Sequence, residues 1–243
     1  MKIVGIIPAR YKSSRFEGKP LADMFGKPMI WWVYEQCKNV NEFEELYVAT
    51  DDDRIEKVCK EYDMNVIMTS KEHKTGTDRI VEVSKTVKAD IYVVVMGDEP
   101  ALSSEDIRMV IPVFNDNKVD TAMLVTKFKN CVDVTNPSTI KLAINKHNEL
   151  IYMSRCPIPF PKGKLDYDYY KNVGVYAFTA DALDFFGKTK AGKLESIEEM
   201  EMLRMLENHR LVKTVYIDTD AMSVDTPKDL DRVKKIISKR DAK

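Results

Sequence analysis

The chain has 243 residues, of which 44% are hydrophobic and 32% charged, and its formal net charge at pH 7 is −1. This balance argues against a general nucleic-acid-binding protein, which would carry a basic excess. No run of 18 apolar residues occurs, so we expect no membrane span, and the N-terminus runs straight into a predicted strand without a signal peptide. The cysteines are far apart without a Cys-x-x-Cys pair: Cys37, Cys59, Cys131 and Cys156. They are typical of reduced thiols in a cytoplasmic protein.

The first half of the chain alternates predicted strands and helices. We predict strands over 3–7, 46–50, 65–68 and 90–95, and helices over 27–38, from 51–53 onward, over 77–87 and over 103–115. Acidic residues 51–53 suit the start of a helix because they can cap its free N–H groups. Repeated strand–helix units of this length predict a mainly parallel, doubly wound sheet flanked by helices.

From about residue 119 the pattern changes. We predict strands over 121–125, 139–144, 150–153 and 173–178, a hairpin turn at 145–148, helices over 180–186 and 195–207, a strand over 212–217 and a helix over 227–238. No Gly/Ser/Pro-rich linker marks a boundary. We therefore expect one domain over 1–243, with antiparallel strands at roughly 121–180 added to the parallel sheet. The charge-rich segment 195–210 is expected to be an amphipathic helix with a solvated face.

A basic loop follows the first predicted strand. It combines cationic and hydroxyl side chains: Arg10, Ser13, Ser14, Arg15 and Lys19. Ligands of open α/β sheets bind at the carboxyl edge, where arginine forks and backbone N–H groups suit phosphate oxygens. The loop matches neither the Walker pattern nor Gly-x-Gly-x-x-Gly. We interpret it as a polyphosphate-binding loop, the alternative being a solvated basic loop.

Two carboxylates are candidates for holding a divalent metal. Asp98 follows Gly97 just past the strand predicted over 90–95, and Asp225 lies two residues before Pro227. Magnesium prefers one or two carboxylates together with phosphate oxygens and water. The alternative for each is that it caps the helix that follows. If the fold brings the two side chains together, they could share a metal ion.

Two further segments offer ligand-binding side chains. Residues 73–79 combine a glycine that allows close approach, Gly76, with Thr75, Thr77 and Arg79, which suits a base or ribose contact. The alternative is a capped helix start with a solvated arginine. Arg155 follows the strand predicted over 150–153 and precedes a rigid Pro-containing stretch, so it is a candidate fork for a carboxylate or phosphate.

Together these motifs resemble the 3-deoxy-manno-octulosonate (Kdo) cytidylyltransferases. The resemblance is carried, in the family's order, by segments 6–21, 26–30, 49–52, 73–79, 97–100, 154–155 and 224–227. It covers nearly the whole chain, from Ile3 to Leu230. It implies a nucleotide-diphospho-sugar transferase-like fold: a mainly parallel nucleotide-binding sheet flanked by helices, with an antiparallel extension through which a homodimer forms.

The resemblance also implies an activity, the transfer of CMP from CTP to an acidic sugar, Kdo or a close relative, with release of pyrophosphate. Mg²⁺ would be held by Asp98 and Asp225. Lys19, Arg10 and Asp98 would be catalytic, and Arg155 would lie near the acid sugar. The nucleotide would be bound by Pro8, Ala9, Arg10, Ser13, Ser14, Arg15, Lys19, His73, Thr75, Gly76 and Arg79. Neither nucleic acid nor a membrane is an expected partner.

Two positions depart from the family pattern. Met96 stands where the family usually has Gln, and Asn172 aligns with a usual His; both usual residues are associated with the acid-sugar side. A different acidic acceptor is therefore an alternative, and the pathway served (lipopolysaccharide, capsule or another glycan) is left open. A non-catalytic sensor on the same fold is disfavoured because it would not need a metal pair. A metal-dependent glycosyltransferase would need an Asp-x-Asp motif, which residues 51–53 satisfy only formally.

Overall fold

The computed structural model describes residues 1–73, 75–129, 134–163 and 167–241. Its strands are β1 (Ile3–Ala9), β2 (Asp23–Met24), β3 (Lys27–Pro28), β4 (Glu45–Thr50), β5 (Val66–Met68), β6 (Ile91–Val95), β7 (Thr121–Lys127), β8 (Lys141–Ile144), β9 (Leu150–Ser154), β10 (Tyr170–Thr179) and β11 (Lys213–Tyr216). Its helices are η1 (Lys19–Leu21), α1 (Met29–Lys38), α2 (Asp53–Glu61), α3 (Gly76–Thr86), α4 (Ser104–Arg108), η2 (Pro112–Asn115), α6 (Ala180–Lys188), α7 (Lys193–Glu198), α8 (Met202–Glu207) and α9 (Pro227–Asp241).

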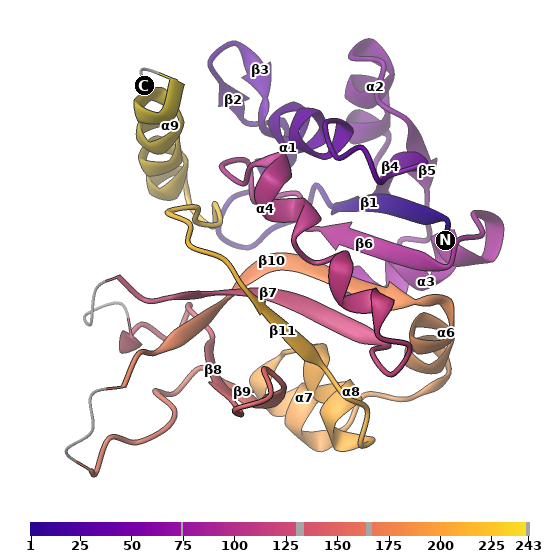
Figure 1. Cartoon of the computed structure of the whole chain (residues 1–243). Helices are drawn as coiled ribbons and strands as arrows, with labels where there is room; N and C mark the ends of the chain where they lie inside the picture. The colour runs from indigo at the N-terminus through magenta and orange to yellow at the C-terminus, as the bar shows by residue number, and fades with distance from the viewer. Residues whose placement is uncertain (74, 130–133, 164–166, 242–243) are drawn as a thin grey trace.

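The main sheet has the strand order β11-β7-β10-β6-β1-β4-β5, and β8 and β9 branch from β10 (Figure 1). Strands β6, β1, β4 and β5 pair in parallel, which confirms the predicted mainly parallel sheet. Strand β10 lies antiparallel between β6 and β7, and β11 is parallel to β7. The antiparallel strands expected at roughly 121–180 are therefore part of the main sheet, and the β8–β9 hairpin branches from β10.

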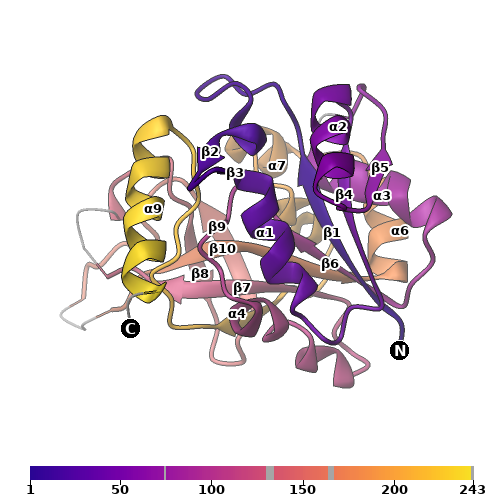
Figure 2. The same cartoon turned by 90° about the horizontal axis from the view of Figure 1, so that it is seen from above.

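Alternating side chains of the central strands divide the core into two layers. On β1, Ile3 and Ile7 belong to one apolar cluster, whereas Val4 and Ile6 belong to the other. The period of two is that of a strand buried on both faces. Helices α1, α2, α4 and α9 contribute buried residues to the first cluster, and α3, α6 and α8 to the second. Figure 2 looks onto the first layer, where α9, α1 and α2 lie in front of the sheet.

Two predicted helices are each divided in the structure. In place of the single helix expected over 103–115, the structure has the short helix α4 and then a 3-10 helix, η2. The second helix begins at Pro112, which has no N–H with which to continue an α-helix. The helix expected over 195–207 is two helices, because Glu199 adopts a left-handed conformation with φ 55° between α7 and α8. The cap predicted within residues 51–53 is present, because the Asp52 side chain accepts from the Arg54 N–H at the start of α2. Helix α4 is capped by Ser103, which accepts from the Asp106 N–H.

The cysteines are free thiols where the structure describes them. Cys37 and Cys59 are buried and Cys156 is exposed, whereas Cys131 lies outside the described residues. Burial raises the pKa of the Cys37 thiol far above its usual range, so this group stays protonated. Among the described residues, no helix combines the length and the apolar character that a membrane crossing requires.

Candidate active site

The candidate site lies at the carboxyl edge of the parallel strands. The chain runs from β1 to β4 on one side and later returns to β6 on the other side of β1, so the strand order changes direction at β1. Open α/β sheets bind ligands at such a point. A cavity of about 780 Å³ opens there. Of the predicted site residues, it is lined by Pro8, Ala9, Arg10, Ser14, Arg15, His73, Thr75, Gly76, Arg79 and Arg155.

The basic loop after β1 is closed on itself. The Gly18 N–H donates to the Tyr11 carbonyl at 2.9 Å, and Gly18 has a φ of 68°, which favours glycine. The Arg54 guanidinium stacks on the Tyr11 ring, 3.3 Å from its centroid. This closure brings Arg15 to the cavity. Ser13 does not line the cavity; its hydroxyl accepts from the Phe16 N–H at 3.3 Å and so helps to shape the loop.

Lys19 lies between the two candidate metal ligands. Its Nζ is 2.6 Å from Oδ2 of Asp98 and 3.9 Å from Oδ1 of Asp225. Arg15, which lines the cavity, donates from Nη2 to Oδ1 of Asp225 at 2.8 Å. The backbones are joined as well, because the Val224 N–H donates to the Asp98 carbonyl at 2.8 Å. The fold thus brings together two carboxylates that are far apart in sequence.

Neither carboxylate caps a helix, so the capping alternatives are wrong. Ser103, not Asp98, caps α4. At the start of α9, the Thr226 hydroxyl accepts from the Asp229 N–H at 3.3 Å, and the Asp229 carboxylate accepts from the Thr226 N–H at 3.0 Å. This is a reciprocal capping arrangement. Asp225 is therefore free to pair with cations of the site.

Two carboxylates around one cationic group fit a magnesium ion. Mg²⁺ takes one or two carboxylates and completes its coordination with phosphate oxygens and water. No group of three or more metal-binding side chains occurs in the described part of the chain, so a site made by protein groups alone is not indicated there. Asp98 and Asp225 are thus the residues that could hold such an ion together with a polyphosphate.

The adjacent Glu99 is buried beneath the site. Burial, and to a smaller extent Asp98, raises the pKa of Glu99 to about 8. Its Oε1 accepts from the Gly174 N–H at 3.1 Å. A Cβ atom at Gly174 would lie 2.7 Å from Cγ of Glu99, so the glycine permits this close approach between β10 and the segment after β6.

Residues 75–79 form a capped helix start, as the alternative expected. Thr75 and Asp78 make a capping box at the beginning of α3. Arg79, however, is not solvated: it is 4% exposed, pairs with Asp51 at 3.2 Å and donates to the Thr69 hydroxyl. His73 lies in the same wall with its ring bonded to the Glu82 carboxylate. Lys74 lies outside the described residues.

One wall of the cavity was not anticipated. It comes from the segment around α7 and α8: Ala191, Glu195, Ser196, Glu199, Met200 and Glu201. The Glu201 carboxylate accepts from the Gly76 and Thr77 N–H groups, both at 3.0 Å, and burial raises its pKa. The expected solvated face is also wrong for Glu195 and Arg204, which form a buried pair at 2.6 Å.

Single-sequence periodicity contains no signal for this wall. The buried pair comes from two different helices, and its charges resemble those of any exposed helix until the fold is known. Of the two residues that depart from the family pattern, Met96 is among the lining residues of the cavity and Asn172 is not. Met96 lines the cavity, and its N–H donates to the Gly174 carbonyl at 2.8 Å. Asn172 donates from Nδ2 to the Tyr176 hydroxyl at 3.0 Å.

Arg155 is held in the cavity wall by backbone groups. Its Nε donates to the Glu198 carbonyl at 3.0 Å and its Nη1 to the Pro137 carbonyl at 3.1 Å. The remaining N–H groups of its fork make no hydrogen bond with residues that the structure describes. Because an arginine fork presents several donors in one plane, Arg155 suits a carboxylate or phosphate of a ligand.

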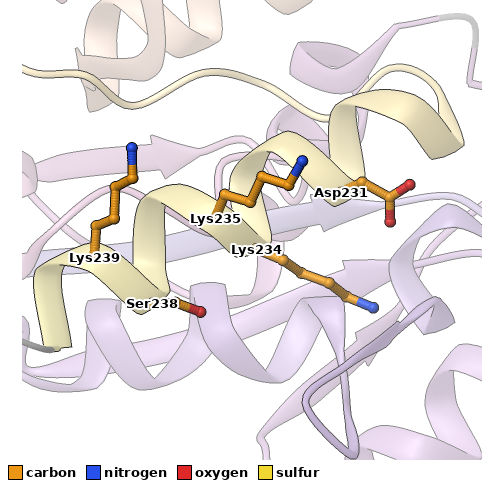
Figure 3. A pocket seen from close by; sticks show the side chains of 5 residues that line it. All are labelled: Asp231, Lys234, Lys235, Ser238 and Lys239. Carbon is orange, nitrogen blue, oxygen red and sulfur yellow. The ribbon is translucent and has the colours of Figure 1, made fainter.

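A second depression lies on the surface of α9 and carries no comparable arrangement. Figure 3 shows its side chains: Asp231, Lys234, Lys235, Ser238 and Lys239. Lys235 and Lys239 point to one side of the helix, whereas Lys234 and Ser238 point to the other. These side chains do not converge on a common point, so we assign no site to this surface.

Comparison with known proteins identifies the family. Residues 4–215 match the Cytidylyltransferase family model. The chain is 40% identical to the 3-deoxy-manno-octulosonate cytidylyltransferase of Parabacteroides distasonis, over 99% of this chain and 100% of that protein. It is 36% identical to the Escherichia coli enzyme of the same name, over 98% and 96% of the two chains.

A comparison with solved structures supports the same family. A structure described as CMP:2-keto-3-deoxy-manno-octonic acid synthetase complexed with CTP matches with a TM-score of 0.93 and 36% identity, covering 99% of this chain and 100% of that one. The inositol-1-phosphate CTP transferase from T. maritima, at 16% identity and a TM-score of 0.66, shares the fold. This chain belongs to the 3-deoxy-manno-octulosonate cytidylyltransferase family of nucleotidyltransferases.

Proposed function

We propose that this chain transfers CMP from CTP to Kdo and releases pyrophosphate. The observation that carries the proposal is the position of Lys19 between Asp98 and Asp225, next to a cavity lined by Arg10 and Arg15, in a chain similar to named Kdo cytidylyltransferases along its full length. Cations and carboxylates in this arrangement suit a metal-bound triphosphate.

The basic loop holds the triphosphate. Arg10 and Arg15 offer planar forks to phosphate oxygens, and Lys19 offers a point charge. The Ser14 hydroxyl adds a hydrogen-bonding group at the cavity, and Ser13 contributes by shaping the loop. On this proposal, Arg15 and Lys19 exchange their carboxylate partners for phosphate oxygens when CTP binds. The β1 end, Pro8–Ala9, and residues 73, 75, 76 and 79 contact the nucleoside. Support comes from their common position around one cavity.

The proposed cofactor is Mg²⁺, held by Asp98 and Asp225 and by the triphosphate. When bound, it would stabilise charge at the α-phosphate and lower the pKa of the attacking hydroxyl. Both carboxylates lie within 4.0 Å of one Lys19 Nζ, which supports a shared cation position.

The reaction is an in-line displacement. The anomeric hydroxyl of the sugar attacks the α-phosphorus, a new O–P bond forms as the hydroxyl loses its proton, and the bond to the β-phosphate oxygen breaks. Arg10, Arg15 and Lys19 take up the negative charge that develops on the leaving pyrophosphate. Such transfers depend on positioning and charge stabilisation rather than on a covalent intermediate. No side chain is assigned as general base.

Arg155 binds the acceptor carboxylate, since it lines the same cavity and its guanidinium has N–H groups that are not used in hydrogen bonds with the described residues. A second candidate function is the activation of a different acidic acceptor. It is favoured by Met96, which lines the cavity but cannot donate a hydrogen bond where the family pattern has Gln.

We further propose a cytoplasmic homodimer, formed through the strands at roughly 121–180 of a single domain over 1–243. Exposed apolar side chains on the projecting part of that segment support this assembly: Ile151 is 58% exposed and Phe160 is 83% exposed. Size-exclusion chromatography with light scattering tests it, because a monomer at micromolar concentration would contradict it.

The first experiment measures pyrophosphate release with Mg²⁺ and CTP, with and without Kdo, alongside UTP, ATP and GTP. Kdo-dependent release from CTP is the expected result. Tight CTP–Mg²⁺ binding without release on Kdo would instead support the second candidate and direct the search to other acidic sugars. Absence of CTP binding would contradict both.

A further inference from the structure

Lys141 is a buried cation that the proposed chemistry does not use. It lies on β8 with 0% of its surface exposed. Its Nζ donates to the carbonyls of Asn136 at 2.7 Å, Thr139 at 2.9 Å and Arg155 at 2.5 Å. An ammonium group has three donors, and here all three are satisfied by neutral carbonyls. Lys141 forms no ion pair with a carboxylate among the residues that the structure describes.

Burying such a charged group is unfavourable to the stability of the folded protein. Removing an ammonium from water is unfavourable unless its donors are satisfied, and an apolar side chain would fill the same space without that penalty. Burial lowers the pKa of Lys141 accordingly. The positive charge of Arg155 also lowers the pKa of Lys141. A second cation close to Arg155 raises the positive potential at this wall of the cavity.

Each of the three carbonyls that Lys141 binds belongs either to Arg155 or to the turn that the Arg155 side chain contacts. The Asn136 and Thr139 carbonyls flank the turn at 136–139, and the Arg155 guanidinium donates to the Pro137 carbonyl of that same turn at 3.1 Å. The third carbonyl belongs to Arg155 itself. Lys141 therefore fixes both the backbone from which the arginine side chain starts and the turn against which its fork rests.

The other contacts of Arg155 come from one residue of α7. The Glu198 carboxylate accepts from the Arg155 N–H at 3.0 Å and the Glu198 carbonyl from Nε at 3.0 Å. Without Lys141, the backbone of Arg155 would keep the Glu198 contacts. The turn at 136–139 would keep its internal bond from the Thr139 N–H to the Asn136 carbonyl at 3.1 Å but would lose both bonds from Lys141. The fork would then lose one of its two supports.

We propose that Lys141 is a positioning residue for acceptor binding: its ammonium holds the Arg155 backbone and the turn at 136–139 so that the Arg155 fork meets the carboxylate of the acceptor. This inference rests on the proposed function, because that function supplies the acidic acceptor. It predicts an effect on the acceptor and not on CTP, since the nucleotide residues lie on other elements.

The test is a double-mutant cycle between Lys141→Met and Arg155→Ala, read in steady-state pyrophosphate release. In K141M we expect the KM for Kdo to rise roughly tenfold or more, as misplacement of a binding group does, with the KM for CTP changed less than about twofold. In the R155A background, K141M should change the KM for Kdo by less than about twofold, because the fork that Lys141 positions is gone.

The matched control is Lys213→Met. Lys213 also donates to a backbone carbonyl, that of His147 at 2.6 Å, but this carbonyl belongs to the turn between β8 and β9 and not to Arg155 or the turn at 136–139. K213M should leave both KM values within about twofold of the parent. Should K141M melt below the assay temperature, K141Q, which keeps two donors without the charge, enters the same cycle. An unchanged KM for Kdo in the folded variant, or an equal effect in the R155A background, would overturn the proposal.

A readout without substrate separates this proposal from the proposed function. The Arg155 Nε–H signal in a nitrogen–proton NMR spectrum, identified by its absence in R155A, should be observed in the parent and in K213M and be shifted or lost in K141M. If the parent releases no pyrophosphate from CTP with Kdo, the proposed function fails, and this signal alone decides the positioning role. A signal unchanged in K141M would refute the role whatever the kinetics.

Discussion

Nζ of Lys19 lies 2.6 Å from Oδ2 of Asp98, although 79 positions separate the two residues in the chain. Both side chains are largely withdrawn from water, with 15% and 21% of their surfaces exposed. The pair joins the basic loop after β1 to the segment after β6. Any change to either partner should therefore affect the proposed phosphate and metal positions together.

Replacing Lys19 by Ala, or Asp98 by Asn, should each reduce kcat for CMP transfer by roughly two or more orders of magnitude, the scale of one lost electrostatic contact to the transition state. The measurement is pyrophosphate release at saturating CTP, Kdo and Mg²⁺. The matched pair on α2, Lys60 and Glu56 at 2.7 Å, serves as control, because K60A should leave kcat unchanged. Near-normal turnover in K19A and D98N would rule out the proposed roles.

Asp225→Asn should raise the Mg²⁺ concentration that gives half-maximal activity by about tenfold or more, because one of two charged ligands is lost. The measurement is a Mg²⁺ titration of the initial rate at fixed CTP, with EDTA added to confirm that metal removal abolishes the activity. Asp231→Asn, a change on the exposed surface of α9, is the control. A Mg²⁺ dependence identical to that of the parent would show that Asp225 holds no metal.

Arg204→Met should lower the free energy of unfolding by about 3–5 kcal/mol, because it leaves the buried Glu195 carboxylate without its partner. The double variant E195L/R204M should recover most of that loss, since neither charge is then buried. Urea denaturation followed by circular dichroism measures both. Arg108→Met is the control: its pair with Glu42 is more exposed and should contribute at most about 1 kcal/mol.

Asp52→Asn should make the free energy of unfolding depend less on pH in the acidic range. Hydrogen bonds from the Arg54 side chain hold the pKa of Asp52 below its usual value near 3.8. For a carboxyl whose folded pKa is lowered, the stabilisation is present above the unfolded pKa and is lost as the pH falls through the folded one. Asn keeps the helix cap but not the charge. The stability difference between the parent and D52N, measured by urea denaturation, should therefore shrink as the pH falls from 6 towards 3.

A difference that stays constant over that range would contradict the assignment. The same variant also tests the loop, because Arg54 pairs with Asp52 at 2.7 Å and stacks on Tyr11. A freer Arg54 should loosen the basic loop and raise the KM for CTP by a few-fold.

The parts of the site that follow a predicted strand could be recognised from sequence. The basic loop and Asp98 are each preceded by a short apolar run, so their place at the carboxyl edge of the sheet follows from the topology alone. The role of Asp225, as a helix cap or as a metal ligand, was left open because both Asp225 and Thr226 precede the helix and either type of residue can cap it. The spacing of Thr226 and Asp229, three residues apart, matches a capping box and could have resolved this ambiguity.

The wall from α7 and α8 could not be predicted for a different reason. Glu195 and Arg204 are charged, and a single sequence offers no way to know that they neutralise each other inside the protein. The break between the two helices depends on one residue, Glu199, in a left-handed conformation that its side chain does not favour. Periodicity therefore predicted one solvated helix where the fold makes a cavity wall.

The place of β10 between β6 and β7 has a consequence for how the protein is made. Val175 of β10 pairs with Val95 of β6, and β11 follows β10 in the chain, so the sheet can be completed only after both strands have been synthesised. During synthesis the basic loop and Asp98 leave the ribosome long before Asp225, so the pair of carboxylates is completed only near the end of translation. A nascent chain that stops before residue 224 would hold the proposed phosphate-binding loop but only one carboxylate, and it would remain inactive until its last elements dock.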